Sequence, residues 1–262
     1  MVTQSQRVEA FRRERRALSA VLSTLETSEW ATPSAAADWT VHDVVAHMSV
    51  GCKALLTPAI LDLVRSSDIE ATNEGAVASR RHWDSDRLVA EYERWSSAAL
   101  RCSAVVGRTP LIHLRVPLAE LGRFRLGVML PGAMFFDHHI HLRHDILTVI
   151  DRDADGSDAL RSSVVVEWMV AVMTNQMRAD GLPWLDAPMN LTLVGDGGGS
   201  WTVEPGGLVT AGLTPGAPTA VRAAVEDFPI WGTARTPWTD HRIEIAGPEE
   251  SVIRFLDGLN IV

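Results

Sequence analysis

The segment at positions 136–146, FDHHIHLRHDI, concentrates side chains that can bind metal ions or move protons. Imidazole nitrogens and carboxylate oxygens are ligands of Zn²⁺, and a histidine also serves as a general acid or base near neutral pH. On a helix with 3.6 residues per turn, Asp137, His141 and His144 share one face. The same segment also fits a solvated polar face without a site, so both interpretations stay open at this point.

Two of the four histidines in this segment are expected to lie off that face. His138 falls at its flank, and His139 falls on the opposite side, at the protein surface. Asp137 and His141 have the i,i+4 spacing that lets two side chains bind one ion.

A catalytic zinc site commonly has three protein ligands and one open position, so a further ligand is expected from another helix. His47 is the candidate, because its apolar neighbours Val44, Val45 and Met48 predict an inward position. Facing helices of a bundle assemble metal sites in the bundle core. The alternative is that His47 is a hydrogen-bonded core residue, which is the commoner role of a lone histidine on an apolar face.

Apolar residues recur at helical spacing through most of the first 150 positions. Thr40 and Asp43 form a capping-box pattern at a helix start. Pro58 is expected to interrupt that helix, and Pro131 is expected to open the fourth long helix, over 131–149. Residues 65–84 are expected to be mainly loop, with part of a helix around 73–81, and residues 107–127 irregular or briefly extended. The predicted helices cover 7–28, 40 to about 64, 85–106, 131–149 and 158–179.

After Pro183 the pattern changes to short alternating runs typical of strands. MNLTLVG and SWTVEP flank the turn sequence GDGGG and predict a hairpin. PTAVRAAV fits a strand or a helix, HRIEIAG predicts a strand, and PEESVIRFLDGL predicts a terminal helix. The expected fold class is α+β, with a four-helix bundle over 1–152 and a small α/β domain over 153–262.

Composition narrows the classes of function. The net charge of −9 argues against binding to nucleic acid or to an anionic membrane surface. The chain lacks an apolar run of transmembrane length and a signal-peptide pattern, so a cytoplasmic protein is expected. Cys52 and Cys102 are expected to be buried reduced thiols. Lys53 is the single lysine, which indicates codon bias in a GC-rich genome.

Two stretches of the chain carry a family resemblance. WTVHDVVAHM at 39–48 resembles the N-terminal signature of the mycothiol-dependent maleylpyruvate isomerase family, whose bundles are DinB-like. The final 35 residues, from FPIWGTARTPW onward, resemble that family's small sterol-carrier-like domain. The resemblance covers nearly the whole chain. With the single lysine, it implies an actinobacterial source in which mycothiol is the main thiol.

The resemblance implies a ligand set. The family's metal-binding histidine falls on His47, and its E-x3-H pair falls on Asp137 and His141. Two departures stand out: an aspartate replaces the glutamate, and the following aspartate, Asp145, is displaced by one position. The implied cofactors are a divalent metal, with Zn²⁺ first, and mycothiol as thiol cosubstrate.

The implied activity is that of a metal- and thiol-dependent isomerase or S-transferase. It would act on a small electrophilic or unsaturated carbonyl substrate through a thiolate activated on the metal. Arg80 and Arg81 are candidate cations for the substrate's carboxylate or enolate, and His144 is a candidate general acid or base. For both arginines, solvated surface positions are the alternative.

Two other classes of function stay open. A metal-free or auxiliary protein could use the same bundle to bind or remodel a hydrophobic natural-product intermediate. A non-enzymatic module could bind a metabolite or thiol. In each case the expected partners are small molecules, with no nucleic acid or membrane, and the chain is expected to be a monomer or homodimer.

Overall fold

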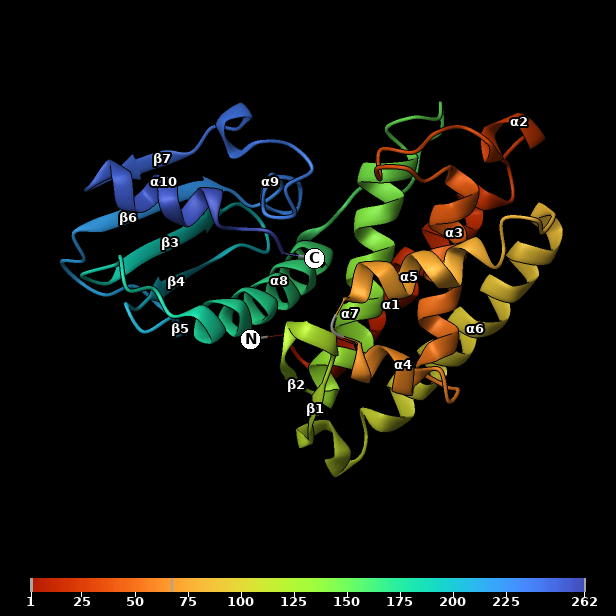
Figure 1. The fold of residues 1–262 in the computed structure, drawn as a ribbon, viewed down its shortest axis with the longest axis horizontal. Helices are drawn as coiled ribbons and strands as arrows, with labels where there is room; N and C mark the ends of the chain where they lie inside the picture. The colour runs from red at the N-terminus through yellow and green to blue at the C-terminus, as the bar shows by residue number, and fades with distance from the viewer. Residues whose placement is uncertain (1, 67, 262) are drawn as a thin grey trace. The chain divides into compact units, whose positions relative to one another are not determined.

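The computed structural model describes residues 2–66 and 68–261, which form two compact units that divide between residues 156 and 157. Figure 1 shows that helices dominate the first unit and that the second contains a sheet. The expected α+β class, with a helical N-terminal part and a C-terminal sheet domain, is confirmed. No helix among the described residues has the length and apolarity to cross a membrane.

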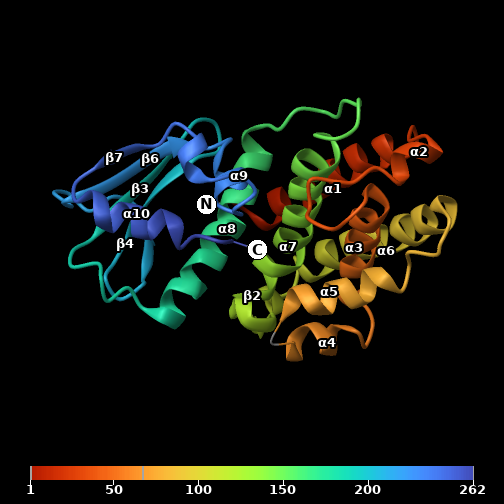
Figure 2. The same ribbon diagram turned by 45° about the horizontal axis from the view of Figure 1, so that its top comes forward.

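Four long helices of the described chain form the bundle of the first unit. α1 packs against α6 and α7, and α3 also packs against both (Figure 2). Their inward faces contribute fully buried apolar side chains, among them Leu18, Val44 and Leu88. Burial of such side chains is the main stabilising contribution to a bundle. The helices are α1 (Gln4–Leu22), α3 (Val41–Ala54), α6 (Ser85–Val106) and α7 (Leu126–Ile140).

The start of α3 follows the predicted capping box. The backbone N–H of Asp43 donates to Oγ1 of Thr40 at 3.2 Å, and the Asp43 carboxylate accepts from the backbone N–H of Thr40 at 3.1 Å. These bonds satisfy donors that the first helical turn leaves unpaired. The interruption expected near Pro58 is also confirmed, because α3 ends at Ala54. Two further helices follow, α4 (Ile60–Arg65) and α5 (Ile69–Ala78).

The predicted helix over 131–149 is wrong at both ends. α7 begins at Leu126 and contains Pro131, which supplies no backbone donor inside the helix. At His141 the backbone changes to a π-helical turn, η3 (His141–Ile146). The backbone N–H of Leu147 accordingly donates to the carbonyl of Leu142, five residues earlier, at 2.9 Å. The 3.6-residue projection of this segment therefore fails after residue 140.

Short elements complete the first unit. β1 and β2 form an antiparallel pair in the region expected to be irregular or briefly extended. This pair leads directly into α7. The elements are α2 (Thr27–Trp30), η1 (Pro110–His113), β1 (Arg115–Pro117), η2 (Ala119–Leu121) and β2 (Arg123–Arg125).

Among the described residues of the second unit, a five-stranded sheet has the order β5-β4-β3-β6-β7. β3 pairs with β6 in parallel and with β4 as the predicted hairpin, and Gly195 and Gly197 adopt positive φ in its turn. The strands are β3 (Met189–Val194), β4 (Gly199–Val203), β5 (Val209–Ala211), β6 (Thr219–Ala224) and β7 (Glu244–Ala246). The helices are α8 (Ala159–Asp180), α9 (Phe228–Trp231), η4 (Trp238–Asp240) and α10 (Glu249–Asp257).

Candidate functional site

The structure brings the three predicted metal ligands together inside the bundle. Nε2 of His47, on α3, lies 3.9 Å from Oδ2 of Asp137, on α7. The ring of His47 lies 4.9 Å from the ring of His141, the first residue of η3. Two segments that are distant in sequence, α3 and the continuous α7–η3 segment, therefore contribute side chains to a single cluster.

Burial makes His47 a neutral imidazole. The residue is only 8% exposed, and burial, followed by the nearby rings of His141 and His138, holds its pKa well below the usual value. A low-dielectric environment disfavours the charged form of a histidine. Its lone pair is thus available to an ion or to a proton donor at neutral pH.

Asp145 fixes the orientation of His141. Oδ2 of the fully buried Asp145 lies 2.7 Å from Nδ1 of His141. Because a carboxylate accepts, Nδ1 carries a proton, and in the neutral tautomer of the ring Nε2 holds the lone pair. A histidine that binds a metal typically donates its other ring N–H to a carboxylate in this way. The displaced aspartate therefore has an evident task as the hydrogen-bond partner of His141.

The donor types of this cluster fit a divalent ion, because two imidazoles and a carboxylate form a usual Zn²⁺ ligand set. The distances between these side chains are longer than those of an assembled metal site. Within residues 2–66 and 68–261, the structure gathers no group of three or more His, Cys, Asp or Glu side chains at metal-binding distances. The 3.9 Å between His47 and Asp137 exceeds the ~3.3 Å that tetrahedral zinc geometry implies between two ligand atoms.

His138 and His139 occupy positions that the helical projection did not predict. His139, expected at the surface, is only 4% exposed, and its Nδ1 lies 3.2 Å from Oε1 of Glu14. That distance places the His139 ring within ion-pair range of the Glu14 carboxylate. His138 is fully buried, between the rings of Phe11 and Tyr92, and its Nδ1 lies 2.7 Å from the carbonyl oxygen of Met134.

Glu14 explains why His139 is buried. Arg143 donates to both oxygens of this fully buried carboxylate, at 2.6 and 3.1 Å. Burial opposes ionisation, but His139 and Arg143 more than offset it and hold the pKa of Glu14 at about 2. The sequence offered an unused indication, since Glu14 lies on the inward apolar face of the first helix.

His144 lies near His139. The centroids of the two rings are 6.1 Å apart, and the residue is half-buried. His144 lies within the π-helical turn that begins at His141, so the shared face expected from a regular helix does not describe its position relative to Asp137. A general acid or base role for His144 stays a prediction.

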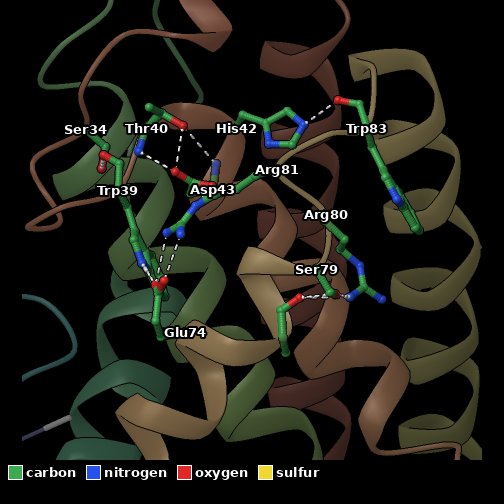
Figure 3. Close-up of polar contacts among 11 residues, drawn as sticks. Ser34, Trp39, Thr40, His42, Asp43, Glu74, Ser79, Arg80, Arg81 and Trp83 are labelled. Carbon is green, nitrogen blue, oxygen red and sulfur yellow. Dashed lines mark hydrogen bonds and ion pairs between the residues drawn. The ribbon is translucent and has the colours of Figure 1, made fainter.

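Arg80 and Arg81 both bond to carboxylates, and Figure 3 shows the bonds of Arg81. Arg80 is 8% exposed and donates to both oxygens of Glu91, at 2.6 and 3.0 Å. Arg81 lies 2.9 Å from Glu74 and 3.2 Å from Asp43. The structure therefore ties both guanidinium groups into ion pairs, and their role towards a substrate stays a prediction.

Trp39 is a member of the cluster that sequence reasoning did not select. Its ring centroid lies 5.1 Å from that of His47 and 6.3 Å from that of His141. The indole N–H donates to Glu74 at 2.9 Å. The aromatic ring thus forms a wall beside the two imidazoles.

Both cysteines are free thiols. Cys52 is buried with its sulfur 3.6 Å from that of Met134, whereas Cys102 is half-buried rather than buried as expected. Burial, with the charge of Asp137, raises the pKa of Cys52. Cys52 is thus a protonated core thiol beside the cluster.

Comparisons with known proteins place the bundle in a family. The family profile described as the mycothiol maleylpyruvate isomerase N-terminal domain matches residues 11–142, which include His47, Asp137 and His141. The chain belongs to this family.

Two solved structures share the fold of the whole chain. They are the mycothiol-dependent maleylpyruvate isomerase, with a TM-score of 0.60, and a single-residue mutant of it, with a TM-score of 0.59. Each is 17% identical to this chain, and each match covers 94% of this chain and 95% of the other. The comparison with curated proteins found no match.

Proposed function

We propose that the chain is a thiol-dependent isomerase or S-transferase that acts on a small electrophilic or unsaturated carbonyl compound, with mycothiol as the thiol. The convergence of His47, Asp137 and His141 inside the bundle of this family is the observation that carries the proposal. The donor chemistry and the neutral state of His47 support it. Solved relatives with the same fold include an isomerase of this kind.

His47, Asp137 and His141 would hold a divalent ion, with Zn²⁺ the first candidate. Such an ion lowers the pKa of a thiol bound to it and so supplies a thiolate at neutral pH. The chain's own residues prepare the position. Burial keeps His47 neutral, Asp145 holds the proton of His141 on Nδ1, and the Trp39 ring packs beside both imidazoles.

Both proposed reactions begin with attack of a thiolate on the substrate. In a cis–trans isomerisation, a thiolate adds to one carbon of a double bond conjugated to a carbonyl, and the electron pair moves to the carbonyl oxygen. Rotation about the new single bond and departure of the thiolate restore the double bond as trans, with no net proton change. An S-transfer begins with the same attack by sulfur and ends with loss of a different leaving group.

A metal-free binding role is the second candidate. The 3.9 Å spacing of His47 and Asp137, and the absence of a gathered three-donor group among the described residues, favour it. In that case the buried imidazoles would accept hydrogen bonds from a ligand.

An assay with mycothiol and a cis-unsaturated keto acid such as maleylpyruvate tests the proposal. We expect thiol-dependent turnover that is lost on chelation and in His47→Ala, and retained in His113→Ala, which removes an exposed histidine of η1. Turnover that survives chelation would favour the metal-free role. No turnover of any tested electrophile, with or without thiol, would contradict the enzyme.

A further inference from the structure

Trp39 is held in place by its backbone. The carbonyl of Trp39 accepts from the backbone N–H and from the hydroxyl of Ser34, both at 2.8 Å. The preceding residue, Asp38, has a φ of +65°, a left-handed conformation that few non-glycine residues adopt. The loop before α3 thus directs the indole by an unusual backbone turn.

One indole ring packs against both imidazoles of the cluster. The ring planes of Trp39 and His47 meet at 40°, and those of Trp39 and His141 at 38°. The two imidazoles themselves are nearly perpendicular, at 76°. Because His47 comes from α3 and His141 from η3, the indole is a shared surface that limits how both rings rotate.

A polar chain at the start of α3 holds the other edge of the indole (Figure 3). The indole N–H donates to Glu74 of α5, Arg81 bonds to the same carboxylate, and Arg81 also reaches Asp43. Asp43 belongs to the capping box of α3, whose N-cap is Thr40, so this chain returns to the helix that carries His47. The hydrogen bond from Trp39, together with Arg81, lowers the pKa of the exposed Glu74.

α5 itself is lightly anchored. Of its residues, all of which the structure describes, only Val77 is buried. The bonds of Glu74 to Trp39 and Arg81 therefore help to tie α5 to the start of α3.

We propose that Trp39 is a positioning residue, which Glu74 holds against His47 and His141 so that the angle between the two imidazoles is fixed. The inference rests on the proposed function of this histidine pair. The interaction that holds the ring is one hydrogen bond, from the neutral indole N–H of Trp39 to the charged carboxylate of Glu74 on α5. Loss of that bond frees the ring to rotate while the bundle core stays intact.

Two single variants and their combination test this. Trp39→Phe keeps an aromatic ring and removes the N–H, and Glu74→Ala removes the acceptor. Glu70→Ala is the matched control, because it removes an equal charge from an exposed position on the same helix. The readouts are the imidazole NMR signals of His47 and His141 without added metal, Co²⁺ affinity, and urea denaturation.

Each single variant should shift both imidazole signals and weaken Co²⁺ binding about tenfold, the lower end for residues that support metal ligands. The double variant should match the singles, because the two changes remove the same bond. Glu70→Ala should resemble the wild type. The inference is overturned if the imidazole signals stay unchanged, or if the two changes add as independent effects.

The NMR readout separates this inference from the proposed function. If the wild type fails to bind Co²⁺, the proposed metal site is wrong, whereas the imidazole signals still decide whether Trp39 positions the pair. If Co²⁺ binds but the signals are insensitive to Glu74→Ala, the metal site stands and the positioning role is wrong.

Discussion

The histidine-rich segment has two sides that differ in how buried charge is balanced. On one side, Asp137 and His141 meet His47 of α3. On the other side, His139 and Arg143 meet Glu14 of α1. Both sides set imidazoles beside carboxylates in the bundle interior, and on the α1 side the guanidinium of Arg143 bonds to both oxygens of the carboxylate.

This difference suggests separate roles for similar residues. An arginine stays charged near neutral pH, so Arg143 remains paired with the Glu14 carboxylate and cannot accept a ligand in its place. A neutral imidazole can turn its lone pair to a metal or a ligand. We therefore expect changes on the α1 side to affect stability, and changes on the α3 side to affect binding.

The largest effect is expected from Glu14→Gln. It leaves the half-buried Arg143 without its charge partner, and loss of one member of a buried pair costs about 3–5 kcal/mol of unfolding free energy. Urea denaturation at pH 7 measures this. Glu9→Gln, on the same helix but partly exposed beside Arg12 and Arg13, is the control and should cost less than about 1 kcal/mol. Equal losses of unfolding free energy in the two variants would contradict the stabilising role assigned to Glu14.

Acid should weaken the same side of the segment. The pKa of Glu14 is about 2 in the folded chain, below its usual value of 4.5. The unfolded chain thus binds more protons between these values, and stability present above pH 4.5 is lost as pH falls towards 2. The loss from this group is about 3 kcal/mol. Denaturation curves between pH 6 and 3 should show a shallower decline in Glu14→Gln, and an unchanged decline would count against the assignment.

Asp145→Asn should act on the other side of the comparison. The amide no longer holds a charged acceptor against Nδ1 of His141, and loss of such a partner weakens metal binding about tenfold or more. Co²⁺ titration measures this change. Asp151→Asn, in the exposed segment after η3, is the control and should bind as the wild type does. Equal Co²⁺ affinity in both variants would show that Asp145 does not support metal binding.

The smallest effect is expected from Asp137→Glu, which restores the residue type of the resembled family. The added methylene lets the carboxylate approach His47 across the present 3.9 Å gap. We expect Co²⁺ affinity to rise by less than about tenfold, because the donor set is unchanged. A fall in affinity would show that the aspartate is already at its best distance.

Local sequence patterns predicted much of the frame around the site. The Thr40–Asp43 capping box, the helix over 85–106 and the hairpin at GDGGG depend on neighbouring residues, and all are confirmed. The inward position of His47 followed from its apolar neighbours in the same way.

The remaining features depend on contacts between distant residues. The π-helical turn at His141 has no local pattern that a 3.6-residue period would reveal. His139 precedes that turn, and it was wrongly expected at the surface because local spacing does not show that α1 packs against its side of α7. The Glu14–Arg143 pair and the Trp39–Glu74 bond each join separate helices. The residue pattern had indicated His47, Asp137 and His141 as a candidate ligand set while leaving the alternatives open, and the resemblance implied the same set.

Metal analysis of the purified chain tests the central claim most directly. The account predicts about one divalent ion per chain in the wild type and in His113→Ala, and less than about a tenth of an ion in His47→Ala. Urea denaturation of the same samples confirms that His47→Ala is folded. A full complement of metal in folded His47→Ala, or none in the wild type after metal is supplied, would contradict the account.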